Sequence, residues 1–199
     1  MKHIAERVHR LDGFTVHTIH TDKFKTNALM LMIKAPLEEK TVSQRALLAQ
    51  LFQNGTERSP SRTKLRERLE AMYGATFTSD VQKKGENHVI AIRLDVANER
   101  FLSSDEPLFQ KALSLLAEVV LSPRLENGVF PESVVHNEKR TLSQRIQSIY
   151  DDKIRYANMR VTEEMCKREP YALPALGKLE DVDAMTSASL YRYYEDVLK

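Results

Sequence analysis

Residues 46–56, ALLAQLFQNGT, decide the fold expected for this chain. The apolar residues of this stretch keep the spacing of one helix face: Leu47, Leu48, Leu51 and Phe52. The pair Asn54-Gly55 is typical of a helix end, because glycine readily adopts the left-handed conformation that closes a helix. Upstream, Thr41 and Gln44 have the spacing of a capping box, which predicts the beginning of the helix.

On both sides of this helix the sequence predicts strands. A second helix is expected over residues 59–74, where Pro60 suits the first turn. Period-two alternation or short apolar runs predict strands at residues 13–21, 28–35, 75–81 and 88–96. The run 28–35, ALMLMIKA, is mostly apolar, and we expect it at the centre of the sheet.

The second half of the chain is predicted to be helical. Apolar stripes predict helices over residues 108–121 and 130–150, and a further helix that ends near Met165. Two short helices follow in the tail, the second capped by Thr186 or Ser187. Strands followed by helices indicate an α+β fold in which helices cover a mixed or antiparallel sheet.

Three segments resemble one enzyme family. The first helix pair, ALLAQLFQNGT and LRERLEAMYGATFTSD (residues 65–80), resembles the start of the pitrilysin/insulinase family of inverted-zincin metallopeptidases. Residues 130–146, FPESVVHNEKRTLSQRI, resemble the family helix that carries a later zinc ligand, and residues 176–198 resemble its Gly-containing segment. The resemblance implies the LuxS/MPP-like half-barrel fold. It also implies that residues 1–199 form a single N-terminal domain from a longer two-domain chain.

The same resemblance shows which chemistry is lost. In active family members a helix carries His-x-x-Glu-His, in which two histidines bind zinc and the glutamate activates water. Counted back from Gly55-Thr56, these positions hold Ala46, Ala49 and Gln50. A third ligand, a glutamate, is expected seven residues after Glu138, where Arg145 stands. The resemblance therefore implies a branch without the zinc motif, with no catalytic residues and no metal site in this chain.

No other catalytic centre is indicated. The histidines are scattered along the chain: His3, His9, His17, His20, His88 and His136. Metal sites gather several ligands, so we interpret these residues as structural or solvated. Cys166 is the only cysteine, which excludes a disulfide framework and a cysteine-based metal site and fits a reducing cytoplasm. No G-x-S-x-G nucleophile motif occurs.

Composition excludes some partners. Thirty basic residues against 28 acidic ones leave a net charge of +2, and the basic residues are dispersed, so no nucleic-acid partner is indicated. The first residues lack the apolar core of a signal peptide, and no stretch is long and apolar enough for a membrane span. We therefore expect a cytoplasmic protein.

What the chain binds is suggested by the family. Active members hold their substrate as a strand added to a sheet edge, a mode that needs no metal. The corresponding residues here are Ala75, Thr76, Phe77, Thr78 and Ser79. An ordinary edge strand without a ligand is the competing interpretation.

The leading hypothesis is an inactive subunit that processes or binds peptides in a heterodimer. Its partner would be an active homologue, and zinc would be present only in that partner. Two alternatives remain: an active zinc endopeptidase with atypical or partner-supplied ligands, and a non-enzymatic scaffold in peptide maturation or export. The peptide, the pathway and the partner are not encoded in any motif found here.

Overall fold

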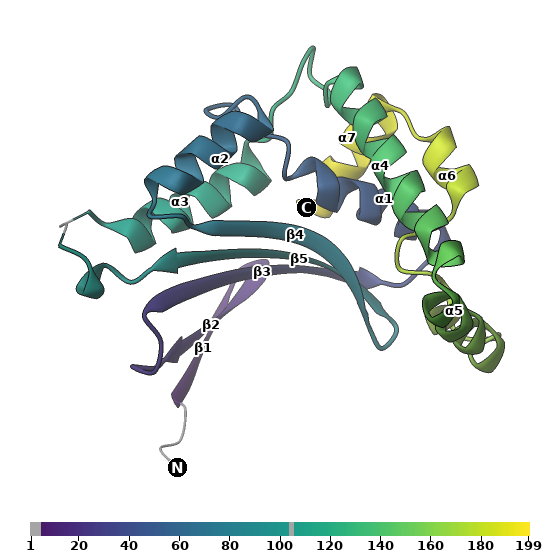
Figure 1. Ribbon diagram of the computed structural model, residues 1–199, viewed down its shortest axis with the longest axis horizontal. Coiled ribbons are helices and arrows are strands. Elements are labelled where there is room, and N and C mark those ends of the chain that lie inside the picture. Colours follow the sequence, from purple (N-terminus) through teal and green to yellow (C-terminus); the bar gives the residue numbers. More distant parts are fainter. Residues whose placement is uncertain (1–4, 104–105) are drawn as a thin grey trace.

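A computed structural model describes residues 5–103 and 106–199 and shows an α+β fold (Figure 1). The strands are β1 (Ala5–Leu11), β2 (Phe14–His20), β3 (Thr26–Pro36), β4 (Thr76–Lys84) and β5 (Asn87–Ala97). The α-helices are α1 (Glu39–Leu51), α2 (Arg62–Ala71), α3 (Leu108–Leu121), α4 (Glu132–Asp151), α5 (Lys153–Met165), α6 (Leu179–Ala184) and α7 (Ser187–Val197). Short 3₁₀ helices cover Glu99–Phe101 and Pro170–Ala172.

The sheet that organises the molecule has three antiparallel strands in the order β3-β5-β4. The helices gather on one of its faces, and the opposite face is open (Figure 1). Alternate β5 residues that include Ile90, Ile92 and Leu94 are fully buried, because the helices pack against the side chains of that face. The predicted fold class, an antiparallel sheet covered by helices, is confirmed.

The strand order corrects one expectation. Residues 28–35 were predicted to be central, but β5 is the central strand, and β3 is bonded on one side only among the described strands. On the open face of β3, Met30 and Met32 are 47% and 48% exposed. The prediction was wrong because a continuous apolar run can also arise when one face of an edge strand is apolar without being covered.

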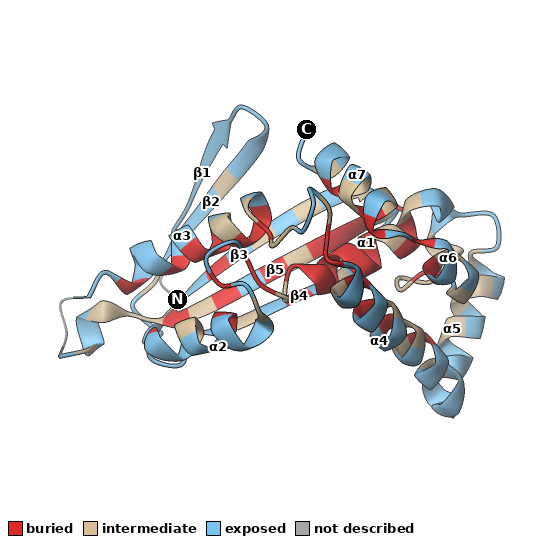
Figure 2. Cartoon of the chain, turned by 90° about the horizontal axis from the view of Figure 1, so that it is seen from above, coloured by how far each residue is buried: buried red, intermediate tan, exposed pale blue. Residues whose placement is uncertain are grey.

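The N-terminal hairpin was missed in part. Strand β2 was expected, but its partner β1 was not, and the two form a separate two-stranded sheet. Leu11 pairs with Phe14, so Asp12 and Gly13 form the turn, and Gly13 has a φ of 82°. Asp-Gly is a strong hairpin signal that the sequence did contain. The hairpin extends away from the sheet, and its surface is almost entirely exposed (Figure 2).

Two predicted helix beginnings are wrong. Helix α2 begins at Arg62 after the N-cap Ser61, so Pro60 precedes the helix and is not in its first turn. Helix α1 begins at Glu39 after Glu38, so the capping box expected at Thr41 and Gln44 is wrong. Helix α7 does have a capping box at Thr186, as one of the two predicted caps. Of the described helices, none is long and apolar enough to cross a membrane.

Candidate functional site

Helix α1 places the motif positions in the interior of the protein. Ala46, Ala49 and Gln50 are 2%, 0% and 3% exposed. Ala46 and Gln50 are four residues apart and share one face of the helix, as two metal-binding residues would. The backbone thus keeps the arrangement that the family resemblance implies, while the side chains offer two methyl groups and one amide.

The turn after α1 is held by specific contacts. Gly55 has a φ of 125°, and a Cβ atom there would lie 2.5 Å from the carbonyl oxygen of Ser59, so the turn requires glycine. The buried Thr56 hydroxyl donates to Glu118 and accepts from the Ser59 N–H at 3.0 Å. Burial would raise the pKa of Glu118, but hydrogen bonds from Thr56 and Arg68 hold it below its ordinary value. Gly55 and Thr56 therefore fix the end of α1 on α3.

Helix α4 brings two further residues to Gln50. With its amide oriented to suit these neighbours, Gln50 donates to the carboxylate of Glu138 at 3.2 Å and accepts from Nη1 of Arg145 at 3.0 Å. Glu138 is buried at 5% exposure and also lies 3.8 Å from Arg62. Arg145, at the expected third-ligand position, thus lies beside Gln50 and carries a cation.

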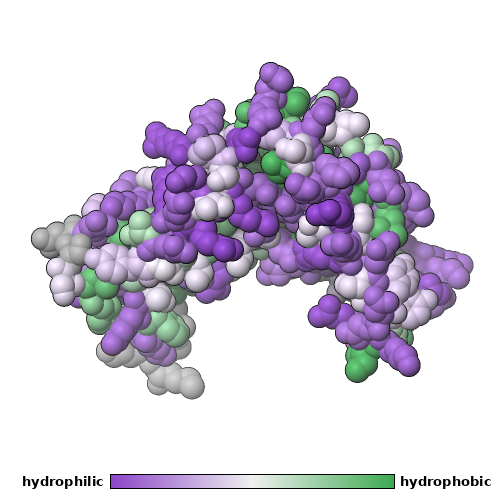
Figure 3. All heavy atoms as spheres, turned by 45° about the horizontal axis from the view of Figure 1, so that its top comes forward, coloured by the Kyte–Doolittle hydropathy of each residue, from purple (hydrophilic) through white to green (hydrophobic). Residues whose placement is uncertain are grey.

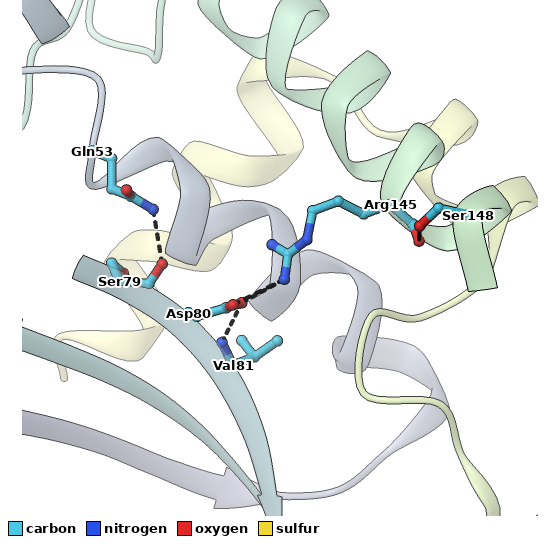
Figure 4. Close-up of polar contacts among 6 residues, drawn as sticks. All are labelled: Gln53, Ser79, Asp80, Val81, Arg145 and Ser148. Carbon is cyan, nitrogen blue, oxygen red and sulfur yellow. Dashed lines mark hydrogen bonds and ion pairs between the residues drawn. The ribbon is translucent and has the colours of Figure 1, made fainter. Parts of the chain in front are cut away.

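Arg145 continues this network to strand β4. Its Nη2 lies 2.9 and 3.1 Å from the two carboxylate oxygens of Asp80 (Figure 4). Asp80 also accepts a hydrogen bond from the N–H of Val81 at 2.9 Å. Nearby, the Gln53 side chain donates to the carbonyl oxygen of Ser79 at 2.8 Å. Helix α1, helix α4 and strand β4 are therefore joined by one set of polar contacts.

Gln53 and Asp80 were not singled out from the sequence. No local pattern marks Gln53, since a glutamine at a helix end is ordinary. Asp80 offered a weak signal, because a carboxylate on a predicted strand often lies at an edge. Its partner Arg145 is 65 residues away in the sequence, so the contact itself could not be anticipated.

These side chains do not fit a zinc ion. Zinc in proteins is bound by thiolate, imidazole or carboxylate groups, and catalytic sites supply three such ligands. The site offers two carboxylates, Glu138 and Asp80, beside an amide and the Arg145 guanidinium, which pairs with Asp80 and would repel a cation. Within residues 5–103 and 106–199, no group of three His, Cys, Asp or Glu residues could hold a metal.

The histidines of the described ranges form no metal-binding group with other ligands. His17 contacts Glu6 at 2.7 Å and His20 lies 3.5 Å from Asp22, all on the exposed hairpin region. His88 is fully buried on β5. Burial, and secondarily the charge of Arg45, lowers the pKa of His88 to about 4. His3 lies outside the described residues.

The residues proposed for peptide contact lie along the edge strand β4. Thr76 and Thr78 are exposed, Phe77 is half-buried and packs against the core, and Ser79 is buried. Ala75, just before the strand, is 9% exposed. Because β4 pairs only with β5 among the described strands, its other side is the edge next to α1 and Arg145.

Fold and site together define a class of protein: a zinc-peptidase-like domain that keeps the backbone frame of the metal centre and lacks its ligands. No protein-family model matches the chain. Over all 199 residues the chain is 44% identical to the "Probable inactive metalloprotease YmfF" of Bacillus subtilis (strain 168), of which it covers 47%. The chain thus spans about half the length of this curated relative.

Solved structures agree with this relationship. A conserved protein from Enterococcus faecalis V583 has a TM-score of 0.86 at 31% identity, over 92% of this chain and 43% of that chain. An inactive domain of a peptidase M16 from Pseudomonas fluorescens has a TM-score of 0.74 at 16% identity, over 96% of this chain and 43% of that chain, which shows the fold alone. The comparisons thus support the resemblance to an inactive domain of the pitrilysin/insulinase-type metallopeptidases.

Proposed function

We propose that this chain is a catalytically inactive half-shell that acts as the non-catalytic subunit beside a zinc-containing homologue in the cytoplasm. Its domain keeps the family frame, including the glycine turn at Gly55 and the approach of α4 to α1. The name of the Bacillus relative, a probable inactive metalloprotease, supports the loss of catalysis. A retained frame without ligands is what a subunit needs when it supplies wall surface and geometry.

The observation that carries the proposal is the contact of Gln50 with Glu138 and Arg145. A site that had merely lost its metal ligands would leave Glu138 buried beside apolar groups, which is strongly destabilising. Here the Gln50 amide donates to that carboxylate and accepts from Arg145, and Arg62 lies 3.8 Å from Glu138. The contacts therefore stabilise the α1–α4 frame without a metal ion, which fits a structural role for the domain.

Peptide binding is the second part of the proposal. An extended peptide would add to the β4 edge beside Ala75 to Ser79, with backbone hydrogen bonds supplying the affinity. Hydrogen exchange at the amides of β4, measured with and without an excess of peptide, tests this part. We expect slower exchange at Phe77 with peptide, and unchanged exchange throughout β4 would favour the scaffold alternative instead.

The pairing has its own test. The chain and an active homologue from the same source are co-expressed, with an affinity tag on this chain only, and the purified material is analysed for mass and zinc. We expect a one-to-one complex whose zinc follows the homologue, and little zinc in this chain alone. Near-stoichiometric zinc in the isolated chain, together with peptide cleavage, would establish the competing interpretation of an active metallopeptidase with atypical ligands.

A further inference from the structure

The free edge of β4 presents the backbone of alternate residues. In an antiparallel strand, successive residues direct their N–H and C=O groups to opposite sides. The carbonyl oxygen of Ser79 accepts a hydrogen bond from the Gln53 side chain, and the N–H of Val81 donates one to the Asp80 carboxylate, so these two residues direct their backbone away from β5. By the same alternation, the backbone N–H and C=O groups of Phe77 also point to the free edge of β4. A peptide that adds a strand at this edge must form hydrogen bonds with the backbone groups of Phe77, Ser79 and Val81.

At Ser79 and Val81, side chains of the protein itself already bond to a backbone group on the free edge. Gln53 donates to the Ser79 carbonyl, and Asp80 accepts from the Val81 N–H (Figure 4). Arg145 holds the Asp80 carboxylate from α4, at 2.9 and 3.1 Å. An added strand cannot extend past Phe77 until these side chains move. We call Gln53, Asp80 and Arg145 together the edge latch.

A groove lined by two arginines lies beside helix α4, and each arginine has a carboxylate partner outside the lining: Asp80 for Arg145 and Asp152, at 3.4 Å, for Arg155. The groove has a volume of about 380 Å³ and runs between α4, α5 and the segment before α6. It is lined by Arg145, Ser148, Ile149, Arg155, Asn158, Met159 and Leu176. This lining contains two guanidinium groups, three apolar side chains and no carboxylate, so it complements a segment that carries both a negative charge and an apolar side chain.

The Arg145–Asp80 pair can be exchanged for another carboxylate. The side chains of Arg145 and Asp80 are 39% and 56% exposed, so water and ligands reach the pair. Exposed ion pairs are weak, and salt screens them. A carboxylate on a peptide offers Arg145 the same charge-assisted hydrogen bonds that Asp80 does, so it can replace Asp80 at little net loss.

We propose that the edge latch closes β4 at Ser79 and Val81, and that a carboxylate of an extended acidic peptide opens it by taking Arg145 from Asp80. Released from Arg145, Asp80 can leave the Val81 N–H, and the peptide backbone pairs with the freed edge while a neighbouring apolar side chain enters the groove. This inference rests on the proposed peptide role, and it names the peptide class as acidic and partly apolar.

The test uses fluorescence anisotropy with two probes. Both are short fluorescein-labelled peptides of alternating valine and threonine, one with a central glutamate and the other with glutamine in its place. We expect the unaltered chain to prefer the glutamate probe by about tenfold at low salt, as one charge-assisted hydrogen bond can provide. Asp80→Ala should bind both probes more tightly, because the Val81 N–H is free and Arg145 has lost its internal partner.

Two further variants separate the latch from general charge effects. Arg145→Gln should abolish the preference for glutamate. Asp95→Ala is the matched control, because Asp95 also pairs with an arginine on this sheet, at 2.6 Å from Arg93, but lies on the central strand β5. It should bind both probes as the unaltered chain does.

The possible failures are distinct. Probes that bind equally to the unaltered chain and Asp80→Ala, without a charge preference, would overturn the edge latch and leave the peptide role intact. A preference that survives Arg145→Gln would also overturn the latch. Probes that bind to none of the folded variants would overturn the peptide role itself, and the latch with it.

Discussion

At the scale of single residues, the α1–α4 contact depends on the ability of the Gln50 amide both to donate and to accept hydrogen bonds. Gln50 donates to Glu138 with its nitrogen and accepts from Arg145 with its oxygen. The buried carboxylate and the neighbouring guanidinium are thereby both satisfied. A side chain without this pairing would leave Glu138 partly unpaired at 5% exposure.

Gln50→Leu should therefore destabilise the protein. The substitution keeps the volume but removes both hydrogen bonds from buried polar groups, so we expect the free energy of unfolding in urea to fall by about 1–3 kcal/mol. Gln110→Leu on α3 is the matched control, because Gln110 is exposed and should be nearly neutral. Equal stability of the two variants would contradict the structural role of Gln50.

A second prediction at the scale of single residues concerns His88 and the dependence of folding stability on pH. Its pKa is lowered to about 4 by burial and then by Arg45, with a smaller effect from Lys83. The unfolded chain has an ordinary histidine pKa near 6.5, so it binds a proton more readily than the folded protein does. Stability from this residue is thus complete above about pH 6.5 and is lost as the pH falls toward 4, by about 3 kcal/mol.

Urea unfolding at a series of pH values measures this loss. His88→Leu, which cannot be protonated, should flatten the curve between about pH 6.5 and 4. His136→Leu is the control, because His136 is exposed on α4, and it should keep the pH dependence of the unaltered chain. An unchanged slope in His88→Leu would show that other groups cause the acid sensitivity.

At the scale of elements, α5 is the helix least supported by the core. None of its residues is buried. Ile154, Val161 and Met165 are 75%, 55% and 79% exposed, and hydrophobic side chains reach the surface on the side of the molecule where α5 lies (Figure 3). Its N-cap is Asp152, whose side chain accepts hydrogen bonds from the N–H groups of Ile154 and Arg155 at 3.1 Å. Local interactions therefore supply much of its stability.

Removing this cap should loosen α5 alone. Asp152→Ala leaves two helix N–H groups without their acceptor, which typically costs about 1 kcal/mol. We expect amide exchange in α5 to quicken roughly fivefold while α3 stays unchanged, since local opening exposes α5 without unfolding the core. Asp151→Ala, one residue earlier and outside the cap, should leave exchange in α5 as it is. Faster exchange in α3 as well would mean that α5 unfolds with the whole domain.

At the scale of the whole molecule, the backbone keeps the arrangement that the family resemblance implies for a metal centre, while the motif positions carry no metal ligands. Three separate elements, α1, α4 and β4, meet around Gln50 and Arg145. The sheet and the glycine turn hold them in place, and none of these supports depends on a metal ion. Activity can thus be lost by changing side chains while the architecture stays.

This view predicts that zinc binding can be rebuilt. Ala46→His, Ala49→Glu, Gln50→His and Arg145→Glu together should bind zinc near one equivalent by elemental analysis, because the backbone frame is present. The same variant with Arg145 retained should bind at least tenfold more weakly, since the cation opposes the metal. Larger side chains at buried alanines cost about 1–3 kcal/mol each, so folding is checked by circular dichroism. A folded fourfold variant without zinc would contradict the retained frame.

Much of this fold could be predicted from local patterns. Helices α3, α4 and α5, strands β4 and β5 and the α7 cap follow from apolar spacing and end signals. The loss of metal ligands follows from residue identity at Ala46, Ala49, Gln50 and Arg145, aligned by the family resemblance. These features depend on residues close together in the sequence, or on which chemical groups a side chain carries.

Only the tertiary structure decided the rest. The apolar run of β3 could suit a central or an edge strand, and its place depends on which strands the helices cover. Likewise Asp80 meets Arg145, and Gln53 meets Ser79, because the sheet and α1 pack in one register. Side-chain periodicity records which face of an element is buried. Contacts between distant residues depend on how those faces are stacked, which is settled by packing of the whole core.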